Sequence, residues 1–257
     1  MLLLVNSTKT MSLSGPLPAR LRTSGPDFAA EATALVAALR ALPPAALARA
    51  VGAEGDLADR ARADLAFWGA AARPSRPALF AFTGLVYQAL DAATLDAAAR
   101  RRAQARLRIL SGLYGLLRPL DRVEAYRLEM GSPLRPEAGV ADLTAFWRPR
   151  LTGALNDHLK DGEAVLSVAA QEYARAIDTA ALRGPLIAPV FKEERPDGSL
   201  KTVTVHAKRA RGALLRHALL TGARRPQDLL GFAADGWSAA APPPAAGPWL
   251  FTRPERG

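Results

Sequence analysis

The chain has 257 residues, a length that suits a single domain, and its 49% hydrophobic and 23% charged residues are typical of a globular protein with a sizeable core. It contains no cysteine, which excludes disulfides and thiol-based metal or redox chemistry. The formal net charge is +10, and the 34 basic residues comprise 29 arginines and five lysines. Such an excess attracts polyanions such as DNA or RNA, although the simpler interpretation is that it only confers solubility.

The first segment, Met1 to Val5, is apolar and could pass for the start of a signal peptide. It has no basic leader and its apolar run stops at Asn6, too short for a signal sequence, so we interpret it as a buried strand. No later apolar run approaches the ~20 residues of a membrane span. We therefore expect a cytoplasmic protein that does not contact a membrane.

Short apolar or alternating runs bounded by Pro, Gly or charged residues predict strands. They are Leu2–Val5, Ala78–Phe82, Ala164–Val168, Ile187–Phe191, Thr202–His206 and, weakly, Trp249–Thr252. Amphipathic stretches predict helices at Asp27–Ala41, Asp56–Trp68, Ala92–Leu110, Leu143–Leu159, Gln171–Leu182 and Ala207–Leu220. The Asp197-Gly198 pair predicts a hairpin between the fourth and fifth strands.

This order of elements predicts an α+β fold, a compact mixed β-sheet surrounded by helices, in one domain spanning residues 1–257. The Ala/Pro-rich stretch Ala239–Pro248 is expected to be a loop, and Arg253–Gly257 a loose tail.

The most distinctive segment is Leu107-Arg-Ile-Leu-Ser-Gly-Leu-Tyr-Gly-Leu-Leu-Arg-Pro-Leu-Asp121. It is predicted to be a helix, a tight turn over Ser111, Gly112, Leu113, Tyr114 and Gly115, and a second apolar piece. This pattern resembles a helix-hairpin-helix element, whose exposed N–H groups hold a DNA phosphate. The alternative is a packed interior turn whose glycines are needed for steric reasons.

The same segment, with Tyr126-Arg-Leu-Glu-Met-Gly131, resembles the signature of the YaaA family of peroxide stress proteins. Further matches extend over nearly the whole chain. They include Lys9-Thr10, Gly84 with Val86-Tyr87, Asp142-Leu143 with Phe146-Trp147, Asn156, Glu172-Tyr173, Pro189-Val190-Phe191, Ala207-Lys208-Arg209-Ala210-Arg211-Gly212, and Phe232 with Gly236-Trp237.

The resemblance implies a compact α+β fold that binds double-stranded DNA and limits oxidative damage by lowering free intracellular iron during peroxide stress. Because the chain lacks cysteine, it cannot sense peroxide through a thiol of its own. The chain departs from the family pattern at Thr83, Leu85, Ala170 and Gln171, where charged or polar residues of the family are replaced. These losses weaken any enzymatic function carried over from the family.

Basic residues adjoin the predicted turn and open the last predicted helix. Arg100, Arg101, Arg102 and Arg106 precede the turn, and Arg118 and Arg127 follow it. Lys208, Arg209, Arg211 and Arg216 share faces of the last helix and are candidate contacts to the phosphate backbone, without sequence specificity. The alternatives are solvated helix surfaces and, for Arg118 and Arg127, structural ion pairs.

A second hypothesis places Lys9, Glu129, Asn156, Glu172 and Tyr173 in one polar cleft with Arg118, Arg127 and Lys208. Such a cleft suits a small-molecule enzyme, or its degenerate remnant, acting on a nucleobase- or nucleotide-like ligand. The three histidines, His158, His206 and His217, lack metal-ligand spacing, and Gly112-x-x-Gly115 is too short for a nucleotide-binding fingerprint. No metal and no cofactor are expected.

Overall fold

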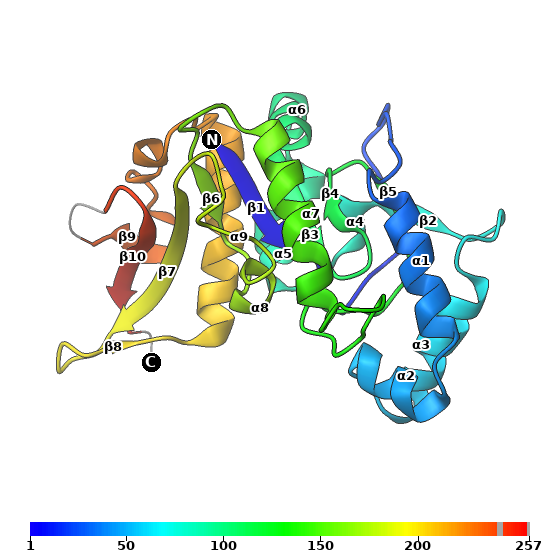
Figure 1. Ribbon diagram of the computed structural model, residues 1–257. Coiled ribbons are helices and arrows are strands. Elements are labelled where there is room, and N and C mark those ends of the chain that lie inside the picture. The colour runs from blue at the N-terminus through cyan, green and yellow to red at the C-terminus, as the bar shows by residue number, and fades with distance from the viewer. Residues whose placement is uncertain (241–243, 256–257) are drawn as a thin grey trace.

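A computed structural model describes residues 1–240 and 244–255. Within them, eight strands form one mixed sheet in the order β4-β3-β1-β6-β7-β10-β9, with β8 paired to β7. The five inner strands β3, β1, β6, β7 and β10 run parallel, whereas β4, β8 and β9 pair antiparallel at the margins. The expected mixed sheet surrounded by helices is confirmed (Figure 1).

The first strand lies at the centre of this sheet. β1 (Leu2–Asn6) pairs with β3 (Leu107–Ser111) on one side and β6 (Val165–Ser167) on the other, and Leu3, Leu4 and Val5 are buried. A continuous apolar run is what a parallel strand covered on both faces requires. The remaining strands of the sheet are β4 (Gly115–Leu117), β7 (Leu186–Glu194), β8 (Leu200–Lys201), β9 (Ser238–Ala239) and β10 (Gly247–Pro254).

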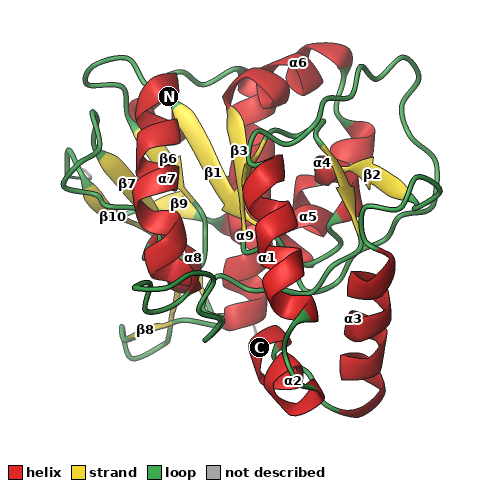
Figure 2. Cartoon of the chain, turned by 45° about the vertical axis from the view of Figure 1, so that its right-hand side comes forward, coloured by secondary structure: helices red, strands yellow, loops and turns green. Residues whose placement is uncertain are grey.

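Helices cover both faces of the sheet. Figures 1 and 2 show α1 (Ala29–Arg40) and α7 (Leu143–His158) over one face, and α5 (Leu85–Leu90) and α9 (Thr204–Thr221) over the other. The other helices are α2 (Pro44–Val51), α3 (Gly55–Phe67), α4 (Ala78–Ala81), α6 (Ala97–Arg106) and α8 (Gln171–Ala174), with short 3₁₀ turns at Ala92–Thr94, Pro226–Leu229 and Ala234–Gly236. A separate two-stranded sheet pairs β2 (Ser75–Pro77) with β5 (Arg122–Glu124).

The predicted helix Ala92–Leu110 is wrong in its second half. Asp96 caps α6 through its side chain, the helix ends at Arg106, and Leu107–Ser111 continues as β3. This strand pairs with β1 in parallel and with β4 in an antiparallel hairpin, so the segment predicted to be a helix-hairpin-helix element is a β-hairpin. Pairing with β1, which lies 104 residues earlier in the chain by the strand register, overrode the local helical pattern.

Two predicted strands are helical instead. In the predicted strand Ala78–Phe82, residues Ala78–Ala81 form α4, because Pro77 ends β2 and leads directly into a helical turn, and a short apolar run fits either structure. Thr202–His206 enters α9, which begins at Thr204. The predicted hairpin with β7 exists, with Gly198 at positive φ in the turn, but its second strand is only Leu200–Lys201.

The remaining differences concern boundaries. The helix predicted over Gln171–Leu182 is one turn, α8, and the chain then runs in turns to β7. The weakly predicted strand at Trp249 extends from Gly247 to Pro254, so Arg253, expected in a loose tail, is buried in the sheet. Of the expected Ala/Pro-rich loop and tail, residues 241–243 and 256–257 lie outside the described part of the chain.

Candidate functional site

Two loops meet where β1 and β6 end. One begins at Ser7, directly after β1, and the other leads from β6 to α8. The chain leaves β1 toward β3 on one side and leaves β6 toward β7 on the other. In open parallel sheets, ligands bind at such a switch point, outside the carboxyl ends of the strands. The arrowhead of β1 in Figure 1 marks this end of the sheet.

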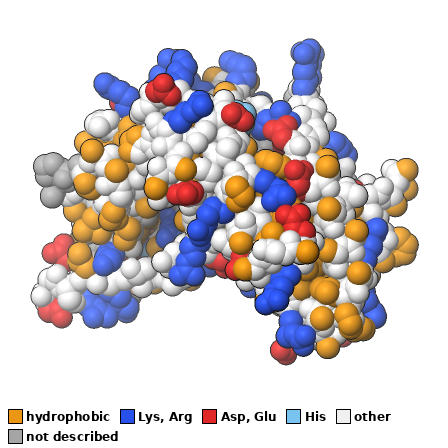
Figure 3. Space-filling model, in the orientation of Figure 1, with side chains coloured by type: hydrophobic (Ala, Val, Ile, Leu, Met, Phe, Trp, Pro, Cys, Tyr) orange, Lys and Arg blue, Asp and Glu red, His pale blue; other side chains and the backbone are white. Residues whose placement is uncertain are grey.

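A cavity of about 460 Å³ opens at this switch point, and we call it the cleft. Its volume lies in the range of small-molecule sites. Figure 3 shows Lys and Arg side chains along the hollowed lower edge of the molecule, between the end that carries β8 and the end that carries α2. The cleft is lined by Asn6, Ser7, Thr8, Lys9, Thr10, Gly84, Leu85, Val86, Glu129, Ala170, Glu172, Tyr173, Lys208 and Arg211.

Acidic and basic groups face each other across the cleft. Lys9 Nζ lies 2.6 Å from Glu129 Oε2, and both side chains are partly exposed. Glu172 Oε1 accepts a hydrogen bond from the backbone N–H of Gly131 at 2.9 Å. A Cβ at Gly131 would lie 3.0 Å from the Glu172 side chain, so glycine permits this close approach. The segment that carries the family-like signature is thereby held against α8.

Buried tyrosine hydroxyl groups contact residues that line the cleft. Tyr173 Oη lies 3.3 Å from Ser7 Oγ, and Tyr87 donates to the carbonyl oxygen of Asn6 at 3.0 Å. Burial raises the pKa of Tyr173 well above its ordinary value and raises the pKa of Tyr126 to about 12. These phenols therefore stay protonated near neutral pH, where they can donate hydrogen bonds but are poor bases.

Helix α9 supplies a cationic wall. Lys208 and Arg211 are three residues apart on one face and both line the cleft. Arg211 Nε is buried without a hydrogen-bond partner among the described residues, and burial lowers the pKa of its guanidinium. A buried donor without a partner costs free energy that a bound acceptor would offset.

Close packing of two helices brings this wall to the cleft. A Cβ at Gly212 would overlap the carbonyl oxygen of Val86, so only glycine lets α9 approach α5 at this point. The start of α5 supplies Leu85 and Val86 to the lining. The packing therefore places Lys208 and Arg211 opposite the loop that follows β1.

The structure brings together four of the five residues predicted for a polar cleft: Lys9, Glu129, Glu172 and Tyr173. Lys208 lines the cleft as well, whereas Arg118 and Arg127, which the same hypothesis placed there, are not among its lining residues. The structure places Asn156 elsewhere, because its Nδ2 donates to the Ala181 carbonyl at 2.8 Å and its Oδ1 accepts from the Arg183 N–H at 2.9 Å. This amide ties the end of α7 to the segment before β7.

The Ser111–Gly115 turn lies in the interior, so the alternative of a packed turn is the correct one. Ser111 is fully buried, and its Oγ contacts Tyr126 Oη at 2.7 Å and accepts from the Tyr114 N–H at 2.9 Å. A Cβ at Gly112 would overlap the Leu128 carbonyl oxygen, and Gly115 has a φ of +66° against Trp147. The turn cannot offer its amides to an external phosphate.

Three arginines predicted to contact DNA have structural partners instead. Arg118 pairs with Asp121 at 3.1 Å and with Asp27 at 2.9 Å. Arg127 donates to the carbonyl oxygens of Val51 and Gly52, at the end of α2. Arg216 donates to two carbonyl oxygens at the end of α5.

Arginine commonly fills this role in the protein, because the last carbonyls of a helix lack partners within it. Arg102 likewise donates to the last carbonyls of α9, and Arg40 donates to carbonyls at the end of α3. Part of the arginine excess is thus explained by the architecture.

The sequence interpretation missed Asn6 and Ser7, which line the cleft, and Tyr126, whose hydroxyl interacts with Ser7. Asn6 and Ser7 carry a usable signal, since polar residues directly after a buried central strand lie at the edge where parallel sheets bind ligands. Tyr126 lies in the quoted signature but contacts Ser111, 15 residues away, only through the fold.

Metal-ligand clusters and membrane-spanning helices are both absent from residues 1–240 and 244–255. No group of three or more His, Cys, Asp or Glu side chains in these ranges is arranged to hold a metal ion. Within the same ranges, every helix is too short or too polar to cross a membrane.

Comparison with known proteins places the chain among bacterial relatives that match it over all or nearly all of their length. A family model described as "Peroxide stress protein YaaA" matches residues 1–242. A UPF0246 protein of Paracidovorax citrulli is 41% identical over 261 residues, covering 100% of both chains. Similar proteins of Janthinobacterium sp. (strain Marseille) and Alcanivorax borkumensis are 38% identical, covering 98% of each chain, and 37% identical, covering 100% of each.

Proposed function

The chain belongs to the family of the peroxide stress protein YaaA, and from this premise we propose that it acts in the peroxide stress response by binding double-stranded DNA. Binding is to the phosphate backbone, without sequence preference, and takes place in the cytoplasm. The observation that carries the proposal is the cationic start of α9, where Lys208 and Arg209 are exposed and Arg211 is half-buried at the cleft.

These three side chains are available to a ligand. None of them forms an ion pair with a described residue, whereas Arg118 and Arg216 do. Each phosphate neutralised by a basic side chain releases condensed counterions, which favours binding at low salt. Lys9 also lines the cleft, but it is already paired with Glu129 at 2.6 Å and is not counted among these contacts. The proposed contact surface is therefore the α9 side of the cleft and excludes the buried turn.

The test is a fluorescence-anisotropy titration of duplex DNA at several salt concentrations. The triple variant Lys208→Ala, Arg209→Ala and Arg211→Ala should bind more weakly, and its slope of log affinity against log salt should fall by about 0.9 for each lost contact. The matched control removes the same charge at Arg22, Arg49 and Arg60, which are exposed and do not line the cleft. Equal weakening by both triples, or no binding at low salt, would remove this proposal.

We propose that the cellular outcome of this binding is a lower concentration of free iron and hence less oxidative damage. The measurement is the chelator-accessible iron signal, by electron paramagnetic resonance, in peroxide-treated cells that lack the gene. Wild-type complementation should lower the signal and the α9 triple variant should not. Equal complementation by both would separate iron control from DNA binding.

A second candidate function is binding of a nucleotide-like small molecule in the cleft, favoured by the convergence of Lys9, Glu129, Glu172 and Tyr173 around one cavity. Two departures from the family pattern, Leu85 and Ala170, also line it. At these two positions apolar side chains replace polar or charged groups that acid–base chemistry would use. The charged and hydroxyl groups that could bind a ligand remain. The cleft thus suits a binding site, or the remnant of an active site, better than an intact catalytic centre.

Calorimetric titration with nucleoside monophosphates tests this candidate. Lys9→Met should weaken binding, whereas Lys192→Met, outside the cleft, should not. A cleft that takes up none of the four common monophosphates would count against it. Retained DNA binding in the same preparations would show that the first proposal stands independently.

A further inference from the structure

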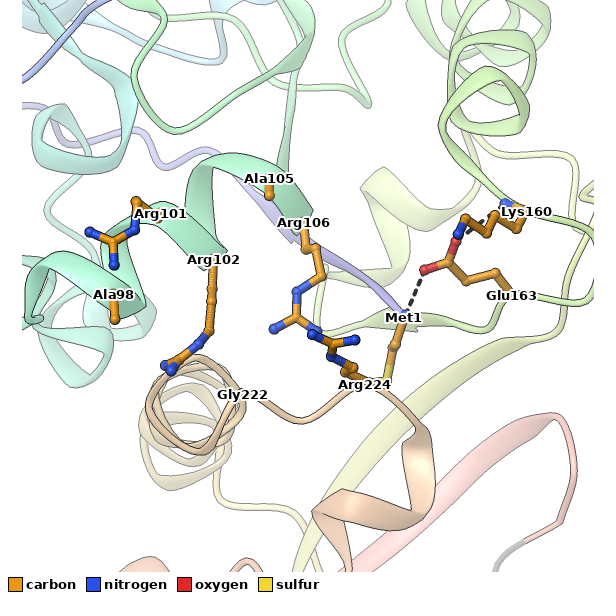
Figure 4. A pocket seen from close by; sticks show the side chains of 10 residues that line it. All are labelled: Met1, Ala98, Arg101, Arg102, Ala105, Arg106, Lys160, Glu163, Gly222 and Arg224. Carbon is orange, nitrogen blue, oxygen red and sulfur yellow. Dashed lines mark hydrogen bonds and ion pairs between the residues drawn. The ribbon is translucent and has the colours of Figure 1, made fainter.

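A second cavity, of about 630 Å³, lies at the opposite end of the central strand. It is lined by Met1 at the start of β1, whereas the cleft begins after the end of that strand. Its other walls come from α6, from the loop between α7 and β6, and from the turn after α9 (Figure 4). The volume is that of a small-molecule site.

The walls of this cavity are strongly basic. They carry Arg101, Arg102, Arg106, Lys160 and Arg224, against a single carboxylate, Glu163. That carboxylate already has partners, because its Oε1 accepts from the α-amino group of Met1 at 2.6 Å and its Oε2 from the Lys160 N–H at 3.2 Å. The side chains of Arg101, Lys160 and Arg224 form no ion pair within the part of the chain that the structure describes.

Two of the guanidinium groups are held in place by the fold. Arg102 donates to the carbonyl oxygens of Leu219 and Leu220 at 2.6 and 3.1 Å, and Arg106 donates to that of Ala223 at 2.6 Å. Each bond uses one terminal nitrogen and leaves other N–H groups of the planar fork for a ligand. A side chain ordered in advance loses little conformational entropy when a ligand binds.

Like charges are held close together here. Figure 4 shows the guanidinium groups of Arg106 and Arg224 beside each other. Burial, and then the charges of Arg224 and Arg102, lower the pKa of Arg106. Gathering cations without a carboxylate between them costs free energy, and a multiply charged anion would offset that cost.

We propose that this cavity binds a compact, multiply charged phosphate compound, of the kind found in condensed phosphates and in the polyphosphate chain of nucleotides. Five cationic side chains from three segments surround one small cavity. A compact ligand with several phosphoryl groups would place its negative charges within reach of all of them. A DNA duplex is a long convex rod and would engage a track of cations along a surface instead. Arginine forks suit the paired oxygens of phosphoryl groups.

The experiment is isothermal titration of the full chain with inorganic tripolyphosphate at low salt. The main variant is Arg101→Gln with Arg224→Gln, because both side chains are exposed and neither supports the fold through a side-chain hydrogen bond. We expect its affinity to fall by at least about tenfold, or 1.4 kcal/mol. Arg106→Gln is a second variant, whose fold is checked by circular dichroism.

The matched control is Arg22→Gln with Arg60→Gln, which removes the same charge at exposed positions that line neither cavity. It should leave tripolyphosphate binding unchanged. The proposal is overturned if tripolyphosphate does not bind, if both double variants weaken binding equally, or if Arg101→Gln with Arg224→Gln abolishes binding of duplex DNA and spares that of tripolyphosphate.

Discussion

The side-chain oxygen of Asn6 accepts a hydrogen bond from the backbone N–H of Ala170 at 2.9 Å. The two residues are 164 positions apart in the chain, yet this bond joins the end of β1 to the loop that follows β6, at the switch point. Asn6 Nδ2 also donates to the Ser7 carbonyl at 2.8 Å. The Asn6 amide thus ties the β6 side of the cleft to the β1 side.

Replacing Asn6 by alanine should destabilise the protein and loosen the cleft. The Ala170 N–H would lose its partner at a partly buried position, at a cost of about 1–3 kcal/mol. Urea unfolding measures the change. The control is Gln88→Ala, whose amide donates to Thr83 at an exposed position and whose loss should change stability by less than about 0.5 kcal/mol. Equal effects would show that the loops are joined by other contacts.

Replacing Gly212 by alanine should disrupt the packing of α9 on α5. A Cβ there overlaps the Val86 carbonyl, and overpacking of this kind costs about 1–3 kcal/mol. The same change at Gly153, inside α7 with nothing within 4 Å, should instead stabilise by about 0.5–1 kcal/mol. Thermal unfolding compares the two variants. We also expect Gly212→Ala to weaken DNA binding, since it displaces Lys208 and Arg211 from the cleft.

Replacing Ser111 by alanine distinguishes an interior turn from a phosphate-binding one. The change leaves the Tyr114 N–H and the buried Tyr126 hydroxyl without this partner, so stability should fall by about 1–3 kcal/mol. The affinity of the folded variant for DNA should equal that of the wild type, measured in the same anisotropy titration. Weaker DNA binding by a variant of unchanged stability would contradict the buried placement of the turn.

Glu193 should make the protein sensitive to acid. Its side chain is 1% exposed and accepts from Arg253 at 2.6 Å, with His206 Nδ1 2.8 Å away. Burial opposes its ionisation, but the hydrogen bonds from Arg253 and His206 outweigh burial and lower the pKa of Glu193. Because the folded pKa lies below the ordinary value of 4.5, this stabilisation is present above pH 4.5 and is lost as the pH falls through the folded pKa.

Urea unfolding between neutral pH and pH 3 tests this dependence. Glu193→Gln should flatten the acid part of the stability profile, whereas Glu194→Gln, at the exposed neighbouring position, should not change it. Arg253→Met leaves the carboxylate buried without its main partner and should cost about 3–5 kcal/mol at neutral pH. An unchanged profile in Glu193→Gln would place the acid sensitivity elsewhere.

Part of the candidate site could be predicted from local sequence alone. Lys9 follows a buried strand, and Glu172 and Tyr173 follow another, so the order of the elements is enough to place them at one edge of a parallel sheet. Asn156 also lies in a matching motif, but its amide reaches only the chain beside α7. A residue's place in a motif does not tell where its side chain points. Only the folded structure shows which side chains come together at one site.

The sequence by itself determined the elements whose pattern is local: the buried strand at Leu2, the long helices α1, α3, α7 and α9, and the Asp197-Gly198 turn. Periodicity and turn chemistry act over a few residues and are readable one segment at a time. Only the tertiary structure decided that Leu107–Ser111 is a strand and that Arg127 and Arg216 hold helix ends. Those outcomes depend on partners about 75 to 125 residues away. Buried backbone groups must be hydrogen-bonded, and their partners can come from any part of the chain that the fold brings near.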